Sequence, residues 1–226
     1  MIYSNVISAI FISRPNRFIA NVLLNGSEEI AHIKNTGRCA ELFVRGAEVY
    51  LQVSNNPERK TKYDVIAVKK GDRIINIDSQ IPNKVFGEYV EHGLFLDNVT
   101  LLKPEFTYKK SRFDFYIETD TDKIFVEVKG VTLDEDGVAR FPDAPTERGI
   151  KHLNELSDAV NNGYKAYAVF VIQMKGIKRF EPNYKMHAAF GEALKNAANN
   201  GVNVIAYDCV VTYDSIMIDD ELPVFI

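Results

Sequence analysis

The run KIFVEVKGVTL, residues 123–133, decides how the second half of this chain folds. Apolar and polar residues alternate along it, as expected for a β-strand whose successive side chains point to opposite faces of a sheet. Glu127 and Lys129 therefore project to one side together with Phe125, and the other side carries Ile124, Val126 and Val128. This strand alone leaves two interpretations open: a solvated strand face, or a site that holds a metal ion and a phosphate.

A second carboxylate stands on the strand expected just before this run. RFDFYIE, residues 112–118, is joined to it by TDTD, residues 119–122, and this arrangement predicts an antiparallel hairpin. Across that hairpin Asp114 and Glu127 become near neighbours, with Lys129 beside them. Hard divalent cations take carboxylate and phosphate oxygens as ligands, and an amine offsets charge on the phosphate. The arrangement is the pattern of the PD-(D/E)xK nucleases, and it favours a site for Mg²⁺, with Mn²⁺ as the alternative.

The segments around the hairpin predict a mixed α/β domain over residues 81–226. A helix is expected before the hairpin, and helices and apolar strands alternate after it. This order is typical of restriction-endonuclease-like α/β/α domains. The expected elements are a helix at 81–93, strands at 105–108, 112–118 and 123–133, a hairpin turning at 136–137, helices at 146–162 and 184–201, and buried strands at 165–174 and 202–208.

Residues 1–80 predict an all-β domain. Five short runs rich in Ile, Val and Tyr are separated by turn-forming residues, and no helical period of useful length lies between them. Five strands in about 75 residues suit a small barrel of the oligonucleotide-binding (OB) type. The expected strands cover residues 18–24, 28–34, 48–54, 63–70 and 73–78.

Cationic and aromatic residues are interleaved in this first half. RPNRF contributes Arg17 and Phe18, and ERKTKY contributes Arg59, Lys60 and Lys62. Barrels of this type bind single strands with cations on phosphates and rings under bases, so the cluster predicts a nucleic-acid surface. The alternative is that the rings belong to the core and the cations to solvated turns. Residues 1–80 carry a net charge of +3 and residues 81–226 one of −7, which fits either interpretation.

The bulk properties indicate an ordinary globular protein. The chain has 226 residues and a net charge of −4, which argues against a strongly basic nucleic-acid binder. No apolar run approaches the roughly 20 residues of a membrane helix, and no basic start precedes a signal-like run, so we expect no membrane partner. Cys39 and Cys209 have no metal-binding spacing and predict free thiols in a reducing, cytoplasmic setting.

A longer stretch carries a resemblance to a known family. RFPDAPTERGIKHLNEL, residues 140–156, resembles a distinctive segment of the sugar fermentation stimulation protein A (SfsA) family, and the resemblance extends to SRFDF, FVEVKGVTL, HIKNTGRC and KTKYDV. It covers essentially the whole chain. The resemblance implies an OB-like N-terminal barrel on a PD-(D/E)xK-like domain, DNA binding, and a link to the regulation of sugar (maltose) metabolism. It leaves open whether nucleic acid is cleaved or only bound.

Carried over by position, the resemblance implies roles for particular residues. Asp114 and Glu127 would be the metal carboxylates, the Val128 carbonyl a further ligand, and Lys129 the positioning amine. The residue before Asp114 is Phe113 rather than the Pro of the motif's name, at a position that varies in such folds. An additional acid is expected from one of three candidates, which are Glu88, Glu91 and Glu105.

Arg148 and His152 lie four residues apart on the helix expected after the site, so they share a face. The functional interpretation is a phosphate contact by Arg148 and a hydrogen bond by His152; the alternative is a surface pair or a satisfied buried histidine.

Two functions follow for the chain: a DNA-binding protein with a metal-dependent phosphodiesterase site, or a DNA-binding regulator without catalysis. A metal enzyme acting on another substrate is a third. Strand type, single-stranded DNA or RNA as substrate, and a homodimeric state stay open.

Overall fold

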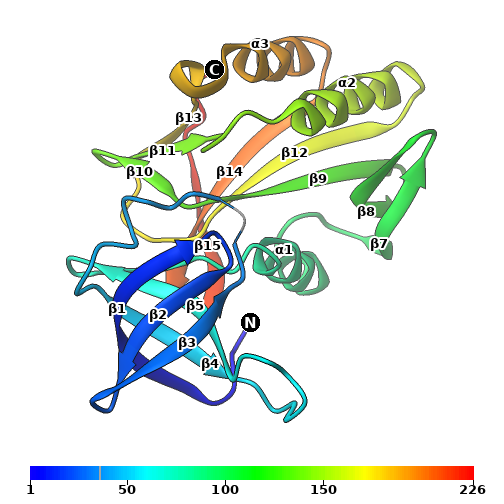
Figure 1. Cartoon of the computed structure of the whole chain (residues 1–226). Helices are drawn as coiled ribbons and strands as arrows, with labels where there is room; N and C mark the ends of the chain where they lie inside the picture. Colours follow the sequence, from blue (N-terminus) through cyan, green and yellow to red (C-terminus); the bar gives the residue numbers. More distant parts are fainter. Residues whose placement is uncertain (36) are drawn as a thin grey trace.

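The computed structural model describes residues 1–35 and 37–226. Thr36, within the HIKNTGRC motif, lies outside the described residues. Figure 1 shows a barrel built from the first part of the chain and, beside it, an α/β domain whose central sheet has helices on both faces. None of the helices in the described ranges is long and apolar enough to cross a membrane.

The N-terminal barrel has five strands, as the sequence predicts. Its strands follow one another in the order β3-β2-β1-β4-β5, and parallel pairing of β3 with β5, at Ala31 and Tyr63, closes the ring. Ala20, Val22 and Val65 fill its interior. The strands of the ring are β1 (Val6–Asn16), β2 (Ile19–Leu24), β3 (Ser27–Ile33), β4 (Glu48–Val53) and β5 (Tyr63–Lys70). A further strand, β6 (Arg73–Asn76), pairs with the C-terminal half of β5.

The membership of the ring differs from the prediction. The expected fifth strand at residues 73–78 is wrong as a member of the ring, because β6 pairs with β5 alone among the described strands. The missing member is β1, near the start of the chain. Two irregularities in the pairing with β2, between Phe11 and Ser13 and between Ser13 and Asn16, interrupt the alternation of β1. A bulged strand shows no clean period of two, so periodicity does not reveal it.

The α/β domain is built on a six-stranded mixed sheet in the order β15-β14-β12-β9-β8-β7, which confirms the predicted mixed α/β fold. The first three strands form an antiparallel meander, and β9, β12 and β14 are parallel. The sheet strands are β7 (Val99–Tyr108), β8 (Ser111–Thr119), β9 (Lys123–Val131), β12 (Lys165–Ile172), β14 (Asn203–Val211) and β15 (Ile216–Leu222); the helices are α1 (Ile81–Glu91), α2 (Glu147–Asn161) and α3 (Tyr184–Asn199).

The two faces of this sheet follow the alternation of β9. Phe125 packs with Leu153 and Leu156 of α2, whereas Val126 packs with Phe86 of α1 on the opposite face. The strand is therefore buried on both sides, as expected for the interior of a sheet covered by helices. Glu127 and Lys129 share the face of Phe125, so their side chains point toward α2.

Local signals place α2 and the small hairpin before it correctly. The Thr146 side chain accepts a hydrogen bond from the Gly149 N–H at 3.1 Å, which is the predicted N-cap. The hairpin of β10 (Leu133–Glu135) and β11 (Val138–Phe141) turns at Asp136 and Gly137, both with positive φ. No sequence pattern predicted β13 (Arg179–Pro182), which pairs in parallel with β11.

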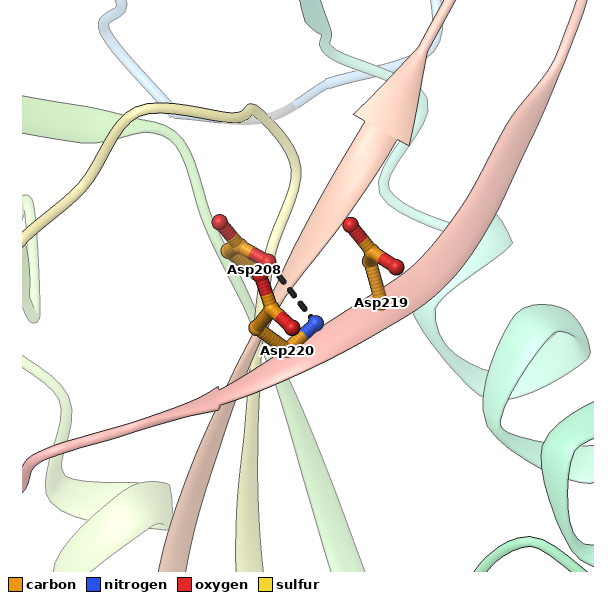
Figure 2. A group of neighbouring side chains, drawn as sticks. All are labelled: Asp208, Asp219 and Asp220. Atoms are coloured by element: carbon orange, nitrogen blue, oxygen red, sulfur yellow. Dashed lines mark hydrogen bonds between the residues drawn. The ribbon is translucent and has the colours of Figure 1, made fainter.

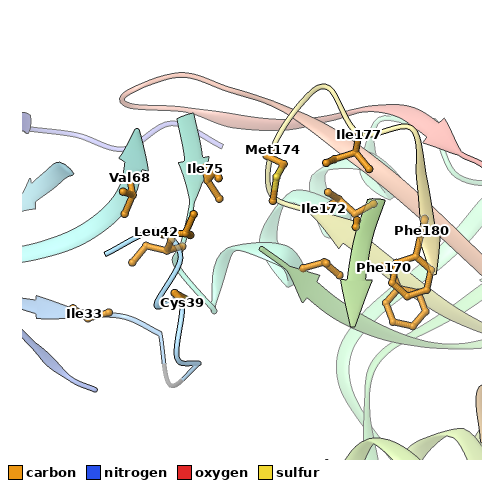
Figure 3. Packing of buried hydrophobic residues seen from close by; sticks show 14 of the residues in the cluster. Ile33, Cys39, Leu42, Val68, Ile75, Phe170, Ile172, Met174, Ile177 and Phe180 are labelled. Atoms are coloured by element: carbon orange, nitrogen blue, oxygen red, sulfur yellow. The ribbon is translucent and has the colours of Figure 1, made fainter. Parts of the chain in front are cut away.

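Barrel and α/β domain share one continuous core. Figure 3 shows part of the cluster, in which Ile33 and Ile75 of the barrel belong to the same packed group as Phe170 and Phe180. A buried polar network crosses the junction as well. Gln173 Nε2 donates to Asn76 Oδ1 at 2.9 Å and to the Asp78 carbonyl at 3.1 Å, and Asn76 Nδ2 donates to the Tyr3 hydroxyl at 2.9 Å. These contacts fix the barrel against the sheet.

Candidate metal and phosphate site

Asp114 sits where the β8–β9 ladder ends. The last regular pair is Phe115 with Val126. Beyond it the Asp114 carboxylate takes the place of a backbone acceptor: Oδ2 accepts from the Val128 N–H and Oδ1 from Asn83 Nδ2, each at 2.8 Å. Burial, and then the charge of Glu127, raises the pKa of Asp114. Two elements, α1 and β9, therefore hold this carboxylate in place.

Glu127 is almost fully buried, with 4% of its surface exposed. Its Oε1 forms short contacts with Lys129 Nζ and with His152 Nδ1. Burial acts to raise the pKa of Glu127, but the His152 hydrogen bond and the Lys129 charge outweigh it and leave the pKa below its ordinary value. Glu127 is thus held as a carboxylate in the interior.

The second oxygen of Glu127 has no partner among the described residues. Oε2 is buried and no donor in residues 1–35 or 37–226 reaches it, although buried polar atoms are nearly always bonded. Each Asp114 oxygen accepts one hydrogen bond and keeps further lone-pair capacity. Carboxylate oxygens of this kind are the ligands that Mg²⁺, Mn²⁺ and Ca²⁺ prefer. The residues present therefore fit a hard divalent cation; the role assigned to the Val128 carbonyl stays a prediction.

A cleft of about 440 Å³ opens beside Asp114, between α1 and the β7–β8 hairpin. All three candidate additional acids line it. Glu88 accepts from the Met1 ammonium at 2.6 Å, and Glu105 pairs with Arg112 at 3.3 Å. Glu91 has no ion pair in the described part of the chain. The structure thus places the three acids beside Asp114 in a cleft that Glu127 and Lys129 do not line, and two of the acids already pair with cations.

His152 and Arg148 extend the site toward α2. His152 is buried, and its ring packs edge-on against Phe113 at a centroid distance of 6.2 Å. Arg148 is exposed and donates from Nε to His152 Nε2 at 3.4 Å. His152 is thus a buried histidine with a hydrogen-bond partner, and that partner is the candidate metal carboxylate Glu127. Both interpretations of His152 are compatible with this contact.

The predicted cations of the barrel are not equivalent. Arg59 makes two hydrogen bonds of 2.7 Å to the buried Asp64, so its charge is balanced within the barrel. Lys60 and Lys62 are exposed and form no ion pair among the described residues. Arg17 lies over the ring of Phe18 at 5.5 Å, and 45% of the Phe18 surface is exposed. A nucleic-acid role for these residues stays a prediction.

A second carboxylate cluster, which no sequence pattern predicted, lies on β14 and β15. Asp208, Asp219 and Asp220 approach one another closely (Figure 2), and Asp208 Oδ1 accepts from the Asp220 N–H at 3.0 Å. Lys175 Nζ contacts all three carboxylates, at 2.9, 2.6 and 2.5 Å. Burial acts to lower the pKa of Lys175, but the three carboxylates outweigh it and raise the pKa well above its ordinary value. An ammonium thus fills this cluster.

Sequence patterns gave no signal for two of these contacts. Asn83 lies on α1, 31 positions before its partner Asp114, and Lys175 follows β12, 33 positions before Asp208. The adjacent acids Asp219 and Asp220 are visible in the sequence, but nothing in their spacing indicates the lysine between them. Such contacts depend on which helices, strands and loops the fold packs against one another.

Comparisons with known proteins place this architecture in a family. The model of the SfsA N-terminal OB domain matches residues 12–77, and that of the sugar fermentation stimulation protein RE domain matches residues 80–215. The chain is 56% identical to a sugar fermentation stimulation protein homolog of Clostridium beijerinckii over 226 residues, covering all of both chains. It is 58% identical over 224 residues to one of Desulfitobacterium hafniense strain Y51, covering 99% and 98% of the two chains.

A solved structure agrees with this assignment. The structure of Pyrococcus furiosus SfsA in complex with Ca²⁺ matches with a TM-score of 0.90 and 31% sequence identity, over 100% of this chain and 98% of that one. The match spans both the barrel and the α/β domain. The chain therefore belongs to the sugar fermentation stimulation protein family.

Proposed function

We propose that this protein binds nucleic acid and hydrolyses its phosphodiester bonds at the Asp114–Glu127 site with a divalent metal ion. The observation that carries the proposal is the unpartnered buried oxygen of Glu127 next to Asp114 and Lys129. Burying a charged carboxylate without full pairing is costly. A module that only binds nucleic acid gains nothing from that cost, whereas a metal ligand needs the free oxygen.

The chain's own groups have distinct tasks in this proposal. Asp114 and Glu127 would hold the metal ion, with the Val128 carbonyl as a further ligand. A bound Mg²⁺ or Mn²⁺ polarises the phosphate and lowers the pKa of a coordinated water. Lys129 contacts Glu127, and its side chain remains 24% exposed, so its ammonium can also face a phosphate and offset the charge that builds on the phosphate oxygens.

The barrel supports nucleic acid as the partner. A cavity of about 180 Å³ is lined by Phe18, His32, Lys34, Ser79 and Gln80, and contains no acidic residue. Ser79 and Gln80 lead directly into α1, whose first turn carries Asn83, the partner of Asp114. Lys34 pairs with the buried Asp64 and Asp78, so the cation beside the exposed ring is Arg17, whose guanidinium lies 5.5 Å from Phe18. A ring and a guanidinium so placed suit a stacked base with its phosphate nearby. The barrel surface and the metal site are thus joined through one turn of helix.

A second candidate is a DNA-binding regulator that uses the same fold without catalysis, in keeping with a role in sugar metabolism. One observation favours it: two of the three additional acids at the cleft already pair with cations, Glu88 with Met1 and Glu105 with Arg112. Glu91 is then the one acid of the three without an ion pair in the described part of the chain, so a bound metal ion has fewer free carboxylates to draw on.

Cleavage assays separate the two candidates. Labelled single-stranded DNA, duplex DNA and RNA would be incubated with the protein and Mg²⁺, Mn²⁺ or EDTA. We expect metal-dependent products that disappear in Asp114→Asn and Glu127→Gln but persist in Asp120→Asn, an exposed acid at the β8–β9 turn of the same hairpin. Binding without cleavage under every condition would support the regulator, and neither binding nor cleavage would exclude both.

A further inference from the structure

A chain of hydrogen bonds runs from the surface of α2 to the buried Glu127. Arg148 Nε donates to His152 Nε2, and His152 Nδ1 contacts Glu127 Oε1. We propose that His152 is a positioning residue, held in a single tautomer by Arg148, that fixes Glu127 with Oε2 turned toward the metal ion. The inference rests on the proposed function, because it assigns Glu127 as a metal ligand.

The tautomer follows from the donors. The guanidinium of Arg148 has only N–H donors and no acceptor, so its contact of 3.4 Å with His152 Nε2 requires a lone pair on that nitrogen. A neutral imidazole with a lone pair on Nε2 carries its proton on Nδ1. That proton points to Glu127 Oε1, which can only accept. The other tautomer would bring two N–H groups together at Arg148 and two acceptors together at Glu127.

The consequence for Glu127 is a fixed division between its two oxygens. Oε1 receives both donors, His152 Nδ1 and Lys129 Nζ, while Oε2 receives none among the described residues. Rotation of the carboxylate would break both contacts at once. Ligating carboxylates are commonly held by such outer hydrogen bonds, whose removal costs metal affinity. His152 therefore contributes orientation without touching the metal ion itself.

The packing of α2 fixes the imidazole in turn. Gly149 allows the helix to approach its neighbours, since a Cβ there would lie 3.0 Å from Thr146 Cγ2 and 3.1 Å from Phe190 Cε2. The Thr146 cap holds the first turn, and Phe113 packs against the ring of His152. Because Arg148 and His152 are four residues apart on this anchored helix, the guanidinium covers the imidazole from the solvent side.

Metal titration in the absence of nucleic acid tests the proposal. The affinity for Mn²⁺ would be measured by calorimetry on the full chain. His152→Leu should lower it by about 10–100-fold, whereas His152→Asn, whose amide N–H can replace Nδ1–H, should stay within about threefold of the original protein. Arg148→Met should lower it by a smaller factor. Lys151→Met, which removes the same charge from the same helix outside the chain of bonds, should have no effect.

A spectroscopic measurement keeps the proposal testable even if a variant fails to fold. The ¹⁵N shifts of His152 in the original protein, assigned among its four histidines, should report protonation at Nδ1 alone. Arg148→Met should give a mixture of tautomers. An Nε2–H signal in the original protein would overturn the inference.

The outcomes also distinguish the two proposals. Unchanged Mn²⁺ affinity in His152→Leu, together with loss in Asp114→Asn, would overturn the positioning role and leave the metal site standing. Equal losses in His152→Leu and His152→Asn would overturn the role of Nδ1. If the original protein binds no Mn²⁺, both the proposed function and this inference fail.

Discussion

Two carboxylate clusters in the α/β domain differ in what balances their charge. Asp208, Asp219 and Asp220 surround the ammonium of Lys175, which contacts all three. Glu127 contacts Lys129 and His152 through one oxygen, and its other oxygen is buried without a partner in the part of the chain that the structure describes. Three carboxylates within reach of one another are therefore a weaker sign of a metal site than one buried oxygen without a partner. Glu155 Oε2 is also buried without a partner among the described residues, so the mark of the site is a free oxygen together with a second carboxylate and an ammonium beside it, and not the number of acids.

Substitution of Lys129 should reduce the cleavage rate more than any other change proposed below alters its own measured quantity. Lys129→Met removes the ammonium that faces both Glu127 and the proposed phosphate, so we expect metal-dependent cleavage to fall by about 10²–10³-fold. Lys123→Met, an exposed lysine on the same strand, is the control. Single-turnover rates measure the change, and equal rates in both variants would contradict the role given to Lys129.

Asp64 in the barrel resembles the Asp208, Asp219 and Asp220 cluster in that cations balance its charge. Arg59 and Lys34 both pair with it. Asp64→Asn should lower the free energy of unfolding at pH 7 by about 2–3 kcal/mol, less than the loss in a fully buried ion pair, because Arg59 stays partly in water. Urea unfolding measures the loss, with the exposed Asp72→Asn as the control.

The pH dependence of this effect has a definite sign. Burial acts to raise the pKa of Asp64, but hydrogen bonds and charges from Arg59 and Lys34 outweigh it, so the pKa in the folded protein is below the ordinary 3.8. A carboxyl group with a lowered folded pKa stabilises the fold above its unfolded pKa and loses that contribution as the pH falls through the folded value. The difference between Asp64→Asn and the original protein should therefore shrink below about pH 4. A difference that grows on acidification would contradict the assignment.

Removing Lys175 tests whether its ammonium keeps metal ions out of the cluster of Asp208, Asp219 and Asp220. Lys175→Met leaves the buried Asp208 without its ammonium, and we expect a loss of about 1–3 kcal/mol in unfolding free energy. The emptied group of three carboxylates should then bind Ca²⁺, so that Ca²⁺ raises the Tm of Lys175→Met more than that of the original protein. Adding Asp219→Asn should remove the gain. If Ca²⁺ raises the Tm of Lys175→Met no more than that of the original protein, removal of the ammonium is not sufficient to make these three acids a Ca²⁺ site.

Removal of the Phe18 ring should have the smallest effect of the changes proposed, a modest loss of affinity for a single strand. If its exposed ring stacks on a base, Phe18→Ala should weaken single-strand binding by about 1 kcal/mol in the presence of EDTA. Phe225→Ala is a matched control, because Phe225 is also exposed and has a guanidinium, that of Arg179, 5.8 Å from its ring. Fluorescence anisotropy with a labelled oligonucleotide measures both. Equal affinities in the two variants would contradict the stacking role given to Phe18.

Periodicity and turn residues were sufficient for much of the fold. The β8–β9 hairpin, the Asp136–Gly137 turn, the Thr146 cap and the buried strand β12 are all local signals, and the structure has them where they were expected. The bulged β1 and the short β13 were not predicted, because bulges hide the alternation of β1 and β13 depends on its distant partner β11.

Alternation along one strand and a short hairpin were enough to predict that Glu127 and Lys129 share a face and that Asp114 lies near them. The contacts of each carboxylate come from the packing of distant elements. Asn83 reaches Asp114 from α1, His152 reaches Glu127 from α2, and Lys175 closes the second acidic cluster. These partners come from elements made neighbours by the packing of helices on the two faces of the sheet, and no local period carries that information.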